Sequence, residues 1–562
     1  MMTIVVLFIL MVMTWIKLMV QGVYLTHKMQ QLGYHNMKFI KWLDGKQFRE
    51  VLMWNIFELL TALLGILICY FTISKTNAYK YIVTVIMLAV FGWKIIHPWL
   101  AGWVGPKARK KNKKSLVYTQ RVIRLLITHG IVSGVVLGFV FVYSIFPIDD
   151  FTYSTCQFFR LNAFLLFISI ISPVIIIISN ILNIPVEALV HRFYFVKAQR
   201  RLRKACLTNV GITGSYGKTS TKFFLSALLH QHYRTLTTPS SYNTPMGISK
   251  VLNGENLTDY ECFVCEMGAD HNGEIAGLCK LAPIKYGILT SIGPQHLETF
   301  GSVENIIKTK FAILTKLPSD GFGVYNYDSE LIRENVNNFN IVAPLHAYSM
   351  EEKDFSKIDA YSDNVHYTRR GLEFTVHFKD GDTIDVSVNV LGRHNVLNLT
   401  AAILTAKLLG LNRDEIMRGI AAIEPVEHRL QLLDSGSGIL VIDDAFNSNL
   451  AGATEALNVL REMEGNNKII ITPGFIDLGA KEDEHNRIFG QIIAEKADIA
   501  IIVGQNRTKQ IQEGILSQNF PTDHLFVVEN LNEATQILSK VAQIGDVVLF
   551  ENDLPDIFDD KN

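Results

Sequence analysis

Five long apolar segments constrain the N-terminal part of this chain more than any other feature. They cover residues 3–21, 52–73, 81–100, 125–147 and 161–184. Each is close to the about 20 residues that a helix needs to cross the hydrocarbon core of a bilayer. The first segment lacks the basic start and the small-residue cleavage site of a signal peptide, so we expect it to remain as a helix. The pattern predicts an α-helical membrane domain over residues 1–204, with the lipid bilayer as a partner.

The loops between these segments carry basic residues unevenly. Residues 26–51 hold five Lys or Arg and residues 101–124 hold a dense basic block, whereas residues 74–80 hold two and residues 148–160 hold one. Since basic loops mark the cytoplasmic side, the N-terminus is expected outside and everything after residue 184 inside, in a bacterial cytoplasmic membrane. The basic block lies between apolar runs, which favours a topogenic loop over a nucleic-acid contact. We therefore expect no nucleic-acid partner.

Residues 185–204 form a basic stretch after the last apolar segment. Its Lys and Arg side chains predict an interfacial helix that lies against anionic headgroups, and a plain linker helix is the alternative.

The residues from 205 onward show a different pattern, in which short apolar runs alternate with helical stretches. This alternation predicts an α/β fold with a mostly parallel sheet. A strand at 207–213 and a helix at 218–229 flank the segment Gly-Ser-Tyr-Gly-Lys-Thr-Ser at 214–220. Glycines at such a turn let backbone N–H groups approach phosphates, Lys218 supplies charge, and Thr219 offers a hydroxyl for Mg²⁺. The segment has the short G-x-x-G-K-[ST] form and predicts a nucleotide site.

Polar motifs follow this loop at regular intervals. Glu266 ends an apolar run, and a carboxylate at the C-terminal end of a strand lies where parallel sheets bind ligands. His296 follows another predicted strand, and Lys308 and Lys310 lie on a predicted helix. Taken singly, such residues are more often solvated side chains or helix caps. The Cys262-x-x-Cys265 pair lacks a second pair at zinc spacing, so we interpret it as part of a buried strand.

The order of these motifs resembles the Mur ligase family of ATP-dependent amide-forming enzymes, most closely its D-alanyl-D-alanine-adding branch. The segments GITGSYGKTSTK, SYNTPMGIS, EMGADHNGEI, LTSIGPQHLETFGS, GRHNVLNLTAA, EHRLQ and DDAFNSN are similar to family motifs in the same order, over about 205–545. The resemblance implies a P-loop central domain with a parallel sheet at 205–425 and a Rossmann-like α/β domain at 426–562.

The resemblance also implies roles for individual residues. ATP and two Mg²⁺ ions are the expected cofactors, and Lys310 aligns with a lysine that the family carbamylates. The implied catalytic residues are Lys218, Asn243, His296 and Lys310. The implied metal ligands are Thr219, Glu266, His296 and Lys310. The implied nucleotide-binding residues are Gly214, Ser215, Gly217, Lys218, Thr219, Ser220, His394, Asn395, Asn398, Arg429 and Asp444.

Two departures from the family pattern bear on the substrate. Membrane helices stand where other members have a UDP-sugar-binding domain, and VVLFENDLPDIF stands where a Lys-Gly-Ser type of segment is expected. These departures suggest an envelope precursor that is lipid-linked or membrane-proximal as the carboxylate, joined to an amino acid or short peptide. The alternatives are a polyglutamate-forming ligase, a membrane-bound ATPase or nucleotide sensor without ligase activity, and a transporter. The first is disfavoured by PVEHRLQ and DDAFNSN, the second by the retained Glu266, His296 and Lys310, and the third by the lack of an evident repeat among the spans.

Overall fold

The structure is a computed structural model whose residues fall into two compact units, residues 1–192 and 193–562. It describes Phe164 and the ranges 2–43, 116–145, 167–239, 242–295, 297–425, 430–434, 436–444, 450–475 and 482–552.

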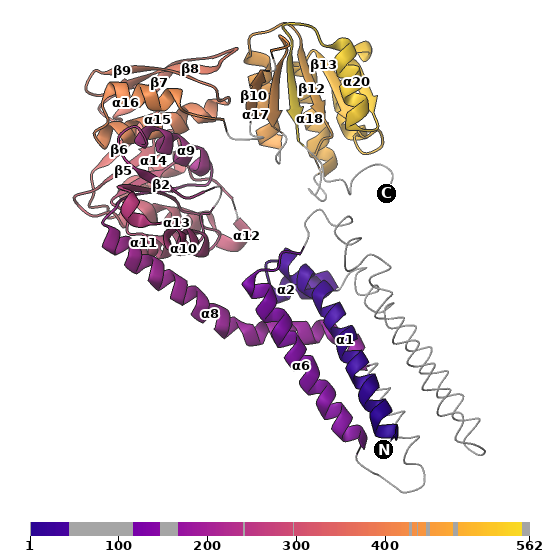
Figure 1. Ribbon diagram of the computed structural model, residues 1–562. Coiled ribbons are helices and arrows are strands. Elements are labelled where there is room, and N and C mark those ends of the chain that lie inside the picture. Colours follow the sequence, from indigo (N-terminus) through magenta and orange to yellow (C-terminus); the bar gives the residue numbers. More distant parts are fainter. Residues whose placement is uncertain are drawn as a thin grey trace. The chain divides into compact units, whose positions relative to one another are not determined.

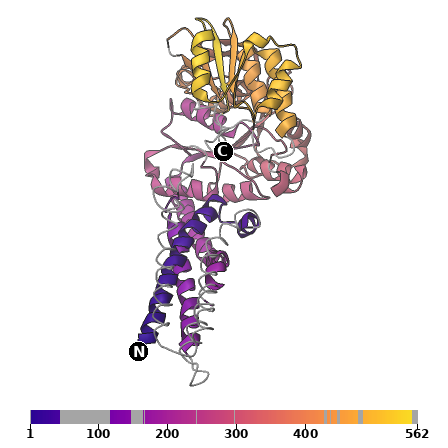
Figure 2. The same ribbon diagram turned by 90° about the vertical axis from the view of Figure 1, so that its right-hand side faces the viewer.

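The first unit is helical, as expected. Its described helices are α1 (Met2–Gln31), α2 (Asn36–Leu43), α6 (Gln120–Ile145) and the first part of α8 (Ser172–Ala205). Helices α1 and α6 run side by side, as Figures 1 and 2 both show. The Trp15 indole donates to the Gly130 carbonyl at 2.9 Å, and the His129 ring contacts the Leu18 carbonyl at 3.1 Å. Polar side chains therefore join the two helices inside an otherwise apolar interface.

A partly buried ion pair joins α6 to α8. The Arg124 guanidinium donates to both carboxylate oxygens of Glu187, at 2.7 and 2.9 Å, and only 9% of the Glu187 side chain is exposed. The two-pronged geometry matches the fixed fork of a guanidinium to a carboxylate and sets the register of the two helices.

The predicted spans are described in part. Segment 3–21 lies within α1, segment 125–147 overlaps α6, and segment 161–184 overlaps the start of α8. The spans predicted at 52–73 and 81–100 lie outside the described residues. Among the helices that are described, Gln120–Tyr143 and Ser172–Ala205 are long and apolar enough to cross a membrane.

The end of α8 is part of the second unit. Ala198 and Leu202 are buried in its core, and Arg201 donates to the carbonyls of Asn253 and Glu255. We predicted a basic juxtamembrane helix with a domain boundary after residue 204. The helix ends at Ala205, but its contacts from residue 193 onward already belong to the second unit. One face of the stretch predicted to lie against headgroups is therefore covered by protein.

The second unit begins with a nine-stranded sheet in the order β2-β3-β1-β4-β5-β6-β7-β8-β9. The strands up to β7 pair in parallel, and β7–β8 and β8–β9 are antiparallel. The predicted parallel sheet is therefore confirmed, with a β-rich extension. The strands are β1 (Thr208–Thr213), β2 (Thr235–Thr237), β3 (Cys262–Glu266), β4 (Tyr286–Leu289), β5 (Phe322–Asn326), β6 (Leu345–Ser349), β7 (Ala360–Thr368), β8 (Gly371–Phe378) and β9 (Thr383–Val388).

Helices cover both faces of this sheet, because alternate strand residues point to opposite sides. Val264 of β3 packs in one core with α9 and α15, whereas Phe263 and Cys265 pack in another with α10, α11 and α13. Cys262 and Cys265 are free and buried, which confirms their structural interpretation, and burial raises the pKa of Cys262 to about 12. The helices are α9 (Lys218–Leu229), α10 (Pro245–Gly254), α11 (Glu274–Leu281), α12 (Leu297–Phe300), α13 (Val303–Thr315), α14 (Glu330–Asn335), α15 (Arg393–Leu408) and α16 (Arg413–Ala421).

The C-terminal domain has a six-stranded sheet in the order β10-β11-β15-β12-β13-β14, antiparallel only at β10–β11. On one face Ile470 and Leu549 pack against α17 to α19, and on the other Ile469 and Val548 pack against α20; Figure 2 shows helices on both sides of this sheet. The elements are β10 (Gln431–Asp434), β11 (Leu440–Asp444), α17 (Leu450–Glu462), β12 (Lys468–Thr472), α18 (Glu482–Lys496), β13 (Ile499–Val503), α19 (Lys509–Leu516), β14 (Leu525–Val528), α20 (Leu531–Val541) and β15 (Val547–Glu551).

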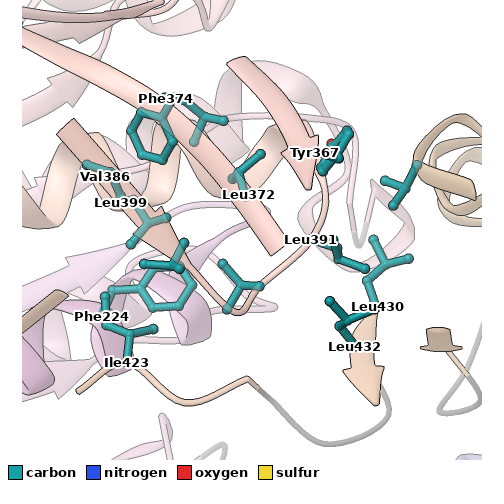
Figure 3. Close-up of a cluster of buried hydrophobic side chains, with 14 of the residues drawn as sticks. Phe224, Tyr367, Leu372, Phe374, Val386, Leu391, Leu399, Ile423, Leu430 and Leu432 are labelled. Atoms are coloured by element: carbon teal, nitrogen blue, oxygen red, sulfur yellow. The ribbon is translucent and has the colours of Figure 1, made fainter. Parts of the chain in front are cut away.

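One apolar cluster joins the two α/β domains. Leu430 and Leu432, at the start of the C-terminal domain, are buried in the same cluster as Leu391 and Phe224. Figure 3 shows Leu391 and Leu430 close to one another, between the end of the central sheet and β10. This contact places the C-terminal domain beside the N-terminus of α15.

The α18–α19 packing yields a stability prediction. A Cβ added at Gly490 would lie 2.2 Å from the Ile511 carbonyl oxygen, so the helix backbones approach too closely for any side chain. We expect Gly490→Ala to destabilise the C-terminal domain by about 1–3 kcal/mol through overpacking. Gly277→Ala in α11 is the matched control, because a Cβ there has open space. Calorimetric unfolding of the full chain measures both, and equal midpoints for the two variants would contradict the close approach.

Candidate active site

A cleft of about 1140 Å³ gathers the polar motifs of both α/β domains. The loop after β1, the end of β3, the N-terminus of α15 and the N-terminal part of α17 all contribute to its walls. Predicted site residues that line it are Ser215, Gly217, Lys218, Thr219, Ser220, Asn243, Glu266, His394, Asn395, Asn398 and Asp444. Residues separated by more than 200 positions thus meet in one site, at the C-terminal ends of parallel strands.

Close backbone approaches hold the phosphate loop in shape. A Cβ at Gly214 would lie 2.1 Å from the Thr290 hydroxyl oxygen, and one at Gly217, where φ is 82°, would lie 2.3 Å from the Asn398 side-chain oxygen. The Thr290 hydroxyl donates to the Tyr216 carbonyl at 2.6 Å, and the Ser215 N–H donates to the Ser291 carbonyl at 2.7 Å. The loop is therefore braced by the strand end at β4 as well as by α15.

Lys218 is the first residue of α9 and reaches back over the loop. Its ammonium donates to the carbonyls of Gly214 and Ser215, at 2.7 and 2.8 Å. The next two residues, Thr219 and Ser220, line the cleft beside it. A cation and hydroxyls at a helix N-terminus form the environment that a phosphate chain and its metal require.

Glu266, the last residue of β3, is a buried carboxylate with unequal oxygens. Its Oε1 accepts from the Asn243 amide at 3.0 Å. Its Oε2 is fully buried and lies 3.3 Å from the Lys222 ammonium, and no other described residue donates a hydrogen bond to it. A buried carboxylate oxygen with spare acceptor capacity, beside the Thr219 hydroxyl in one cleft, fits the oxygen ligands that Mg²⁺ prefers.

Lys310 lies on α13 and is only 3% exposed, whereas its neighbour Lys308 is exposed. Its ammonium lies 3.4 Å from the Ala269 carbonyl, just beyond the end of β3. Burial and then the charge of Lys218 lower the pKa of Lys310 to about 8, while Glu274 and Asp270 act in the opposite direction. A much larger fraction of Lys310 is therefore in the neutral amine form at a given pH than of an exposed lysine.

The N-terminus of α15 supports the loop from the other side. The Thr221 hydroxyl donates to the Asn398 Oδ1 at 3.3 Å, and the Asn398 amide donates to Asn395 at 3.0 Å. Asn395 in turn donates to the Leu391 carbonyl at 2.7 Å. Asn395 and Asn398 thus connect the phosphate loop to the C-terminal end of the central sheet. His394 lines the cleft next to them.

The C-terminal domain contributes acidic groups. Asp444 ends β11 and accepts from the Leu430 N–H at 3.1 Å. Glu455 of α17 accepts from the Arg393 N–H at 3.0 Å and lines the cleft as well. Of the remaining predicted site residues, His296 and Arg429 lie outside the described residues, and Gly214 and Lys310 are not among the residues that line the cleft.

Sequence reasoning missed two groups in this site. Glu455 had no motif to mark it, because its place depends on how the two domains pack. Lys222 lies in the loop motif itself, four residues after Lys218, and helical spacing puts it on the same side of α9. It is buried beside Glu266, and burial lowers its pKa while Glu266 opposes the change.

Comparisons with known proteins agree with this arrangement. Residues 212–406 match the Mur ligase middle domain, and residues 428–551 match the domain described as "Mur ligase, glutamate ligase domain". The UDP-N-acetylmuramoyl-tripeptide–D-alanyl-D-alanine ligase of Escherichia coli is 32% identical over 275 residues, 49% of this chain and 59% of that protein. The Bacillus subtilis protein of the same name is 28% identical over 373 residues, 63% of this chain and 76% of its own length.

A solved structure extends the likeness to the fold. The MurF ligase of Thermotoga maritima in complex with ADP superposes with a TM-score of 0.53 and 23% identity, over 64% of this chain and 80% of that chain. The chain therefore spans only part of the length of the proteins it is similar to, and the matched family domains begin at Ile212.

Proposed function

The chain contains the middle and C-terminal domains of the Mur ligase family, and from this premise we propose that it is an ATP-dependent ligase that forms an amide bond through an acyl phosphate. Its amine substrate is an amino acid or short peptide, and its carboxylate substrate is a cell-envelope precursor. The observation that carries the proposal is that Lys218 and Glu266 line one cleft, while Lys310 lies directly behind its wall, 3.4 Å from the carbonyl of the lining residue Ala269.

This set of residues suits the chemistry of amide formation. A carboxylate resists attack by an amine, so the γ-phosphoryl group of ATP is first transferred to it, and the amine then displaces phosphate. Lys218 neutralises the phosphate chain and the backbone of the loop orients it. Glu266 and the Thr219 hydroxyl would hold Mg²⁺, which would supply charge neutralisation for the transferring group. A simple nucleotide sensor does not require Lys310 as well.

Lys310 supports a second charged site if its amine reacts with carbon dioxide. The neutral amine attacks CO₂, a C–N bond forms, and one proton is released, which leaves a carbamate anion. The pKa of about 8 makes the neutral amine available near neutral pH. The carbamate would add an oxygen ligand for a second Mg²⁺ ion, near Asp270 and Glu274. His296 is proposed as a further ligand from the family resemblance.

The membrane location of the enzyme and the nature of its carboxylate substrate are part of the same proposal. Support comes from the two described helices with spanning character and from the basic loops of residues 26–51 and 101–124. With the helices in the bacterial cytoplasmic membrane and the N-terminus outside, the ligase domains lie in the cytoplasm, where ATP is available. A lipid-linked precursor would then present its peptide carboxylate near the cleft.

A substrate comparison tests this proposal. The purified full chain is incubated with ATP, Mg²⁺ and D-alanyl-D-alanine, and ADP release is measured with either UDP-N-acetylmuramoyl-tripeptide or a lipid extract of bacterial envelopes. We expect ADP release to depend on both amine and carboxylate and to be faster with the lipid extract. Faster release with the soluble nucleotide-sugar would overturn the lipid-linked substrate, and ADP release that needs no carboxylate would favour an ATPase.

A further inference from the structure

Lys222 and Glu266 form a charge pair at the floor of the phosphate site. Lys222 lies one turn into α9, and Glu266 ends β3, which pairs with β1 directly before the loop. The ammonium and carboxylate Oε2 are 3.3 Å apart, and the two side chains are 0% and 1% exposed. The Lys222 ammonium also lies 4.2 Å from the centre of the Phe223 ring.

Such a pair is costly as a purely structural device. Removing two charges from water costs several kcal/mol per ion, and well-packed apolar residues often serve a core as well or better. The pair has a reason to persist if Glu266 is kept as a carboxylate to bind a metal ion. It then needs a counter-ion as long as no metal ion is bound.

The two carboxylate oxygens of Glu266 have different contacts. Oε1 is fixed by the Asn243 amide, and the Glu266 N–H is fixed by the Thr238 hydroxyl at 3.2 Å. Oε2 lies 3.3 Å from the Lys222 ammonium and accepts no hydrogen bond from any other described residue. The Asn243 amide therefore orients the carboxylate from one side, while Lys222 neutralises its charge from the other.

We propose that Lys222 is the built-in counter-ion of Glu266, and that it keeps the affinity of the site for a bare divalent cation low, so that the metal is captured together with the nucleotide phosphates. The proposal rests on the metal-binding role of Glu266 within the proposed function. With Lys222 present, the pair carries no net charge, and a free cation gains little by approaching it. The negative phosphate chain of the nucleotide restores the attraction, because it lies over the same loop.

Removal of the Lys222 charge should raise the affinity of the site for a divalent cation. Lys222→Met keeps nearly the same length and removes the charge, so Glu266 becomes an uncompensated anion. We expect the variant to bind Mn²⁺, used as a spectroscopic probe without nucleotide, roughly tenfold or more tightly than the unchanged chain, because the repulsion between the Lys222 ammonium and the metal cation is removed. With ATP present, the difference should become smaller.

Paramagnetic resonance titration of Mn²⁺ into the purified full chain measures this directly. Lys280→Met, which removes an exposed lysine of α11, is the control for a general loss of charge and should leave Mn²⁺ affinity unchanged. Glu266→Gln should bind Mn²⁺ more weakly than the unchanged chain. If Lys222→Met does not yield folded protein, Lys222→Gln removes the same charge and the same increase is expected.

Weaker or unchanged Mn²⁺ binding in a folded Lys222 variant would overturn the counter-ion role and indicate a structural pair. The titration needs neither turnover nor a known carboxylate substrate. A chain that shows this increase in metal affinity but never forms an amide would refute the proposed ligation alone. A ligase whose Lys222 variants bind Mn²⁺ no more tightly would refute the counter-ion alone.

Discussion

Lys218→Met is expected to lower the rate of ATP-dependent phosphoryl transfer by about a thousandfold, the upper end of the loss seen when one preorganised charge-stabilising donor is removed. The ammonium already lies over the loop, anchored on the carbonyls of Gly214 and Ser215. Phosphoryl transfer requires little covalent chemistry from the protein, so positioning and charge neutralisation account for most of the catalysis. Methionine preserves the length of the side chain and removes both.

The variant is assayed by ADP formation with saturating ATP, and its fold is checked by thermal unfolding. Lys316→Met removes an exposed lysine shortly after α13 and should retain full activity. Lys218 is partly buried and makes polar contacts with its own loop, so a modest loss of stability is expected as well. A folded Lys218→Met protein that keeps more than about a tenth of the activity would be incompatible with the phosphate-binding role, which predicts a loss of at least a hundredfold.

Lys310→Ala is expected to lower ligase activity by about a hundredfold or more, comparable to the loss of a group that supports a metal site. The proposed carbamate supplies a negative oxygen donor, and alanine cannot form one. Added acetate or propionate should restore part of the activity, because a small carboxylate can occupy the vacated space and supply the missing oxygen. The amount restored should rise with carboxylate concentration and saturate.

Lys308→Ala is a closely matched control. Lys308 lies on the same helix, two positions earlier, and is exposed, so its removal should change neither activity nor the response to acetate. If the Lys310→Ala protein were fully active, Lys310 would have no essential role. If it were inactive at every carboxylate concentration, the lysine would be needed as an ammonium rather than as a carbamate.

Much of the α/β fold could be predicted from the sequence, because local signals and tertiary packing agree there. The predicted helix after the phosphate loop and the observed α9 have the same bounds, Lys218–Leu229. The buried strand predicted around Cys262 and Cys265 is also confirmed, and it is shorter than the predicted run of residues 260–267, since β3 covers Cys262–Glu266. In the β-rich extension of β7, β8 and β9, buried and exposed residues alternate as in a half-buried strand, which is clear in β9.

Other features depend on contacts that no single segment encodes. The prediction of an interfacial helix after residue 184 rested on its charge, but Arg201 uses its guanidinium to hold two carbonyls at the end of α10. The support of Gly217 by Asn398 joins residues 181 positions apart, and the Glu455 position depends on domain packing. The pairing of Lys222 with Glu266 required knowing that β3 lies next to β1.

The candidate site also contains residues that the sequence indicated and residues whose position depends on tertiary packing. The order of motifs indicated Lys218, Thr219, Glu266 and Asn398, and the structure brings all four to the same cleft. It did not indicate that Lys310 is buried while Lys308 is not, because both lie on one helix with similar neighbours in sequence. Helix rotation relative to the sheet decides between them, and the packing of α13 on β4 and α11 sets that rotation.

Trapping of an acyl phosphate tests the central claim most directly. The full chain is incubated with ATP, Mg²⁺, an envelope lipid extract and hydroxylamine in place of the natural amine, and products are analysed by mass spectrometry. We expect an acyl hydroxamate of the precursor carboxylate, formed with one ADP per hydroxamate and absent with Lys218→Met. ADP release at an undiminished rate when the carboxylate is left out, with no hydroxamate formed from either the lipid extract or UDP-N-acetylmuramoyl-tripeptide, would contradict it.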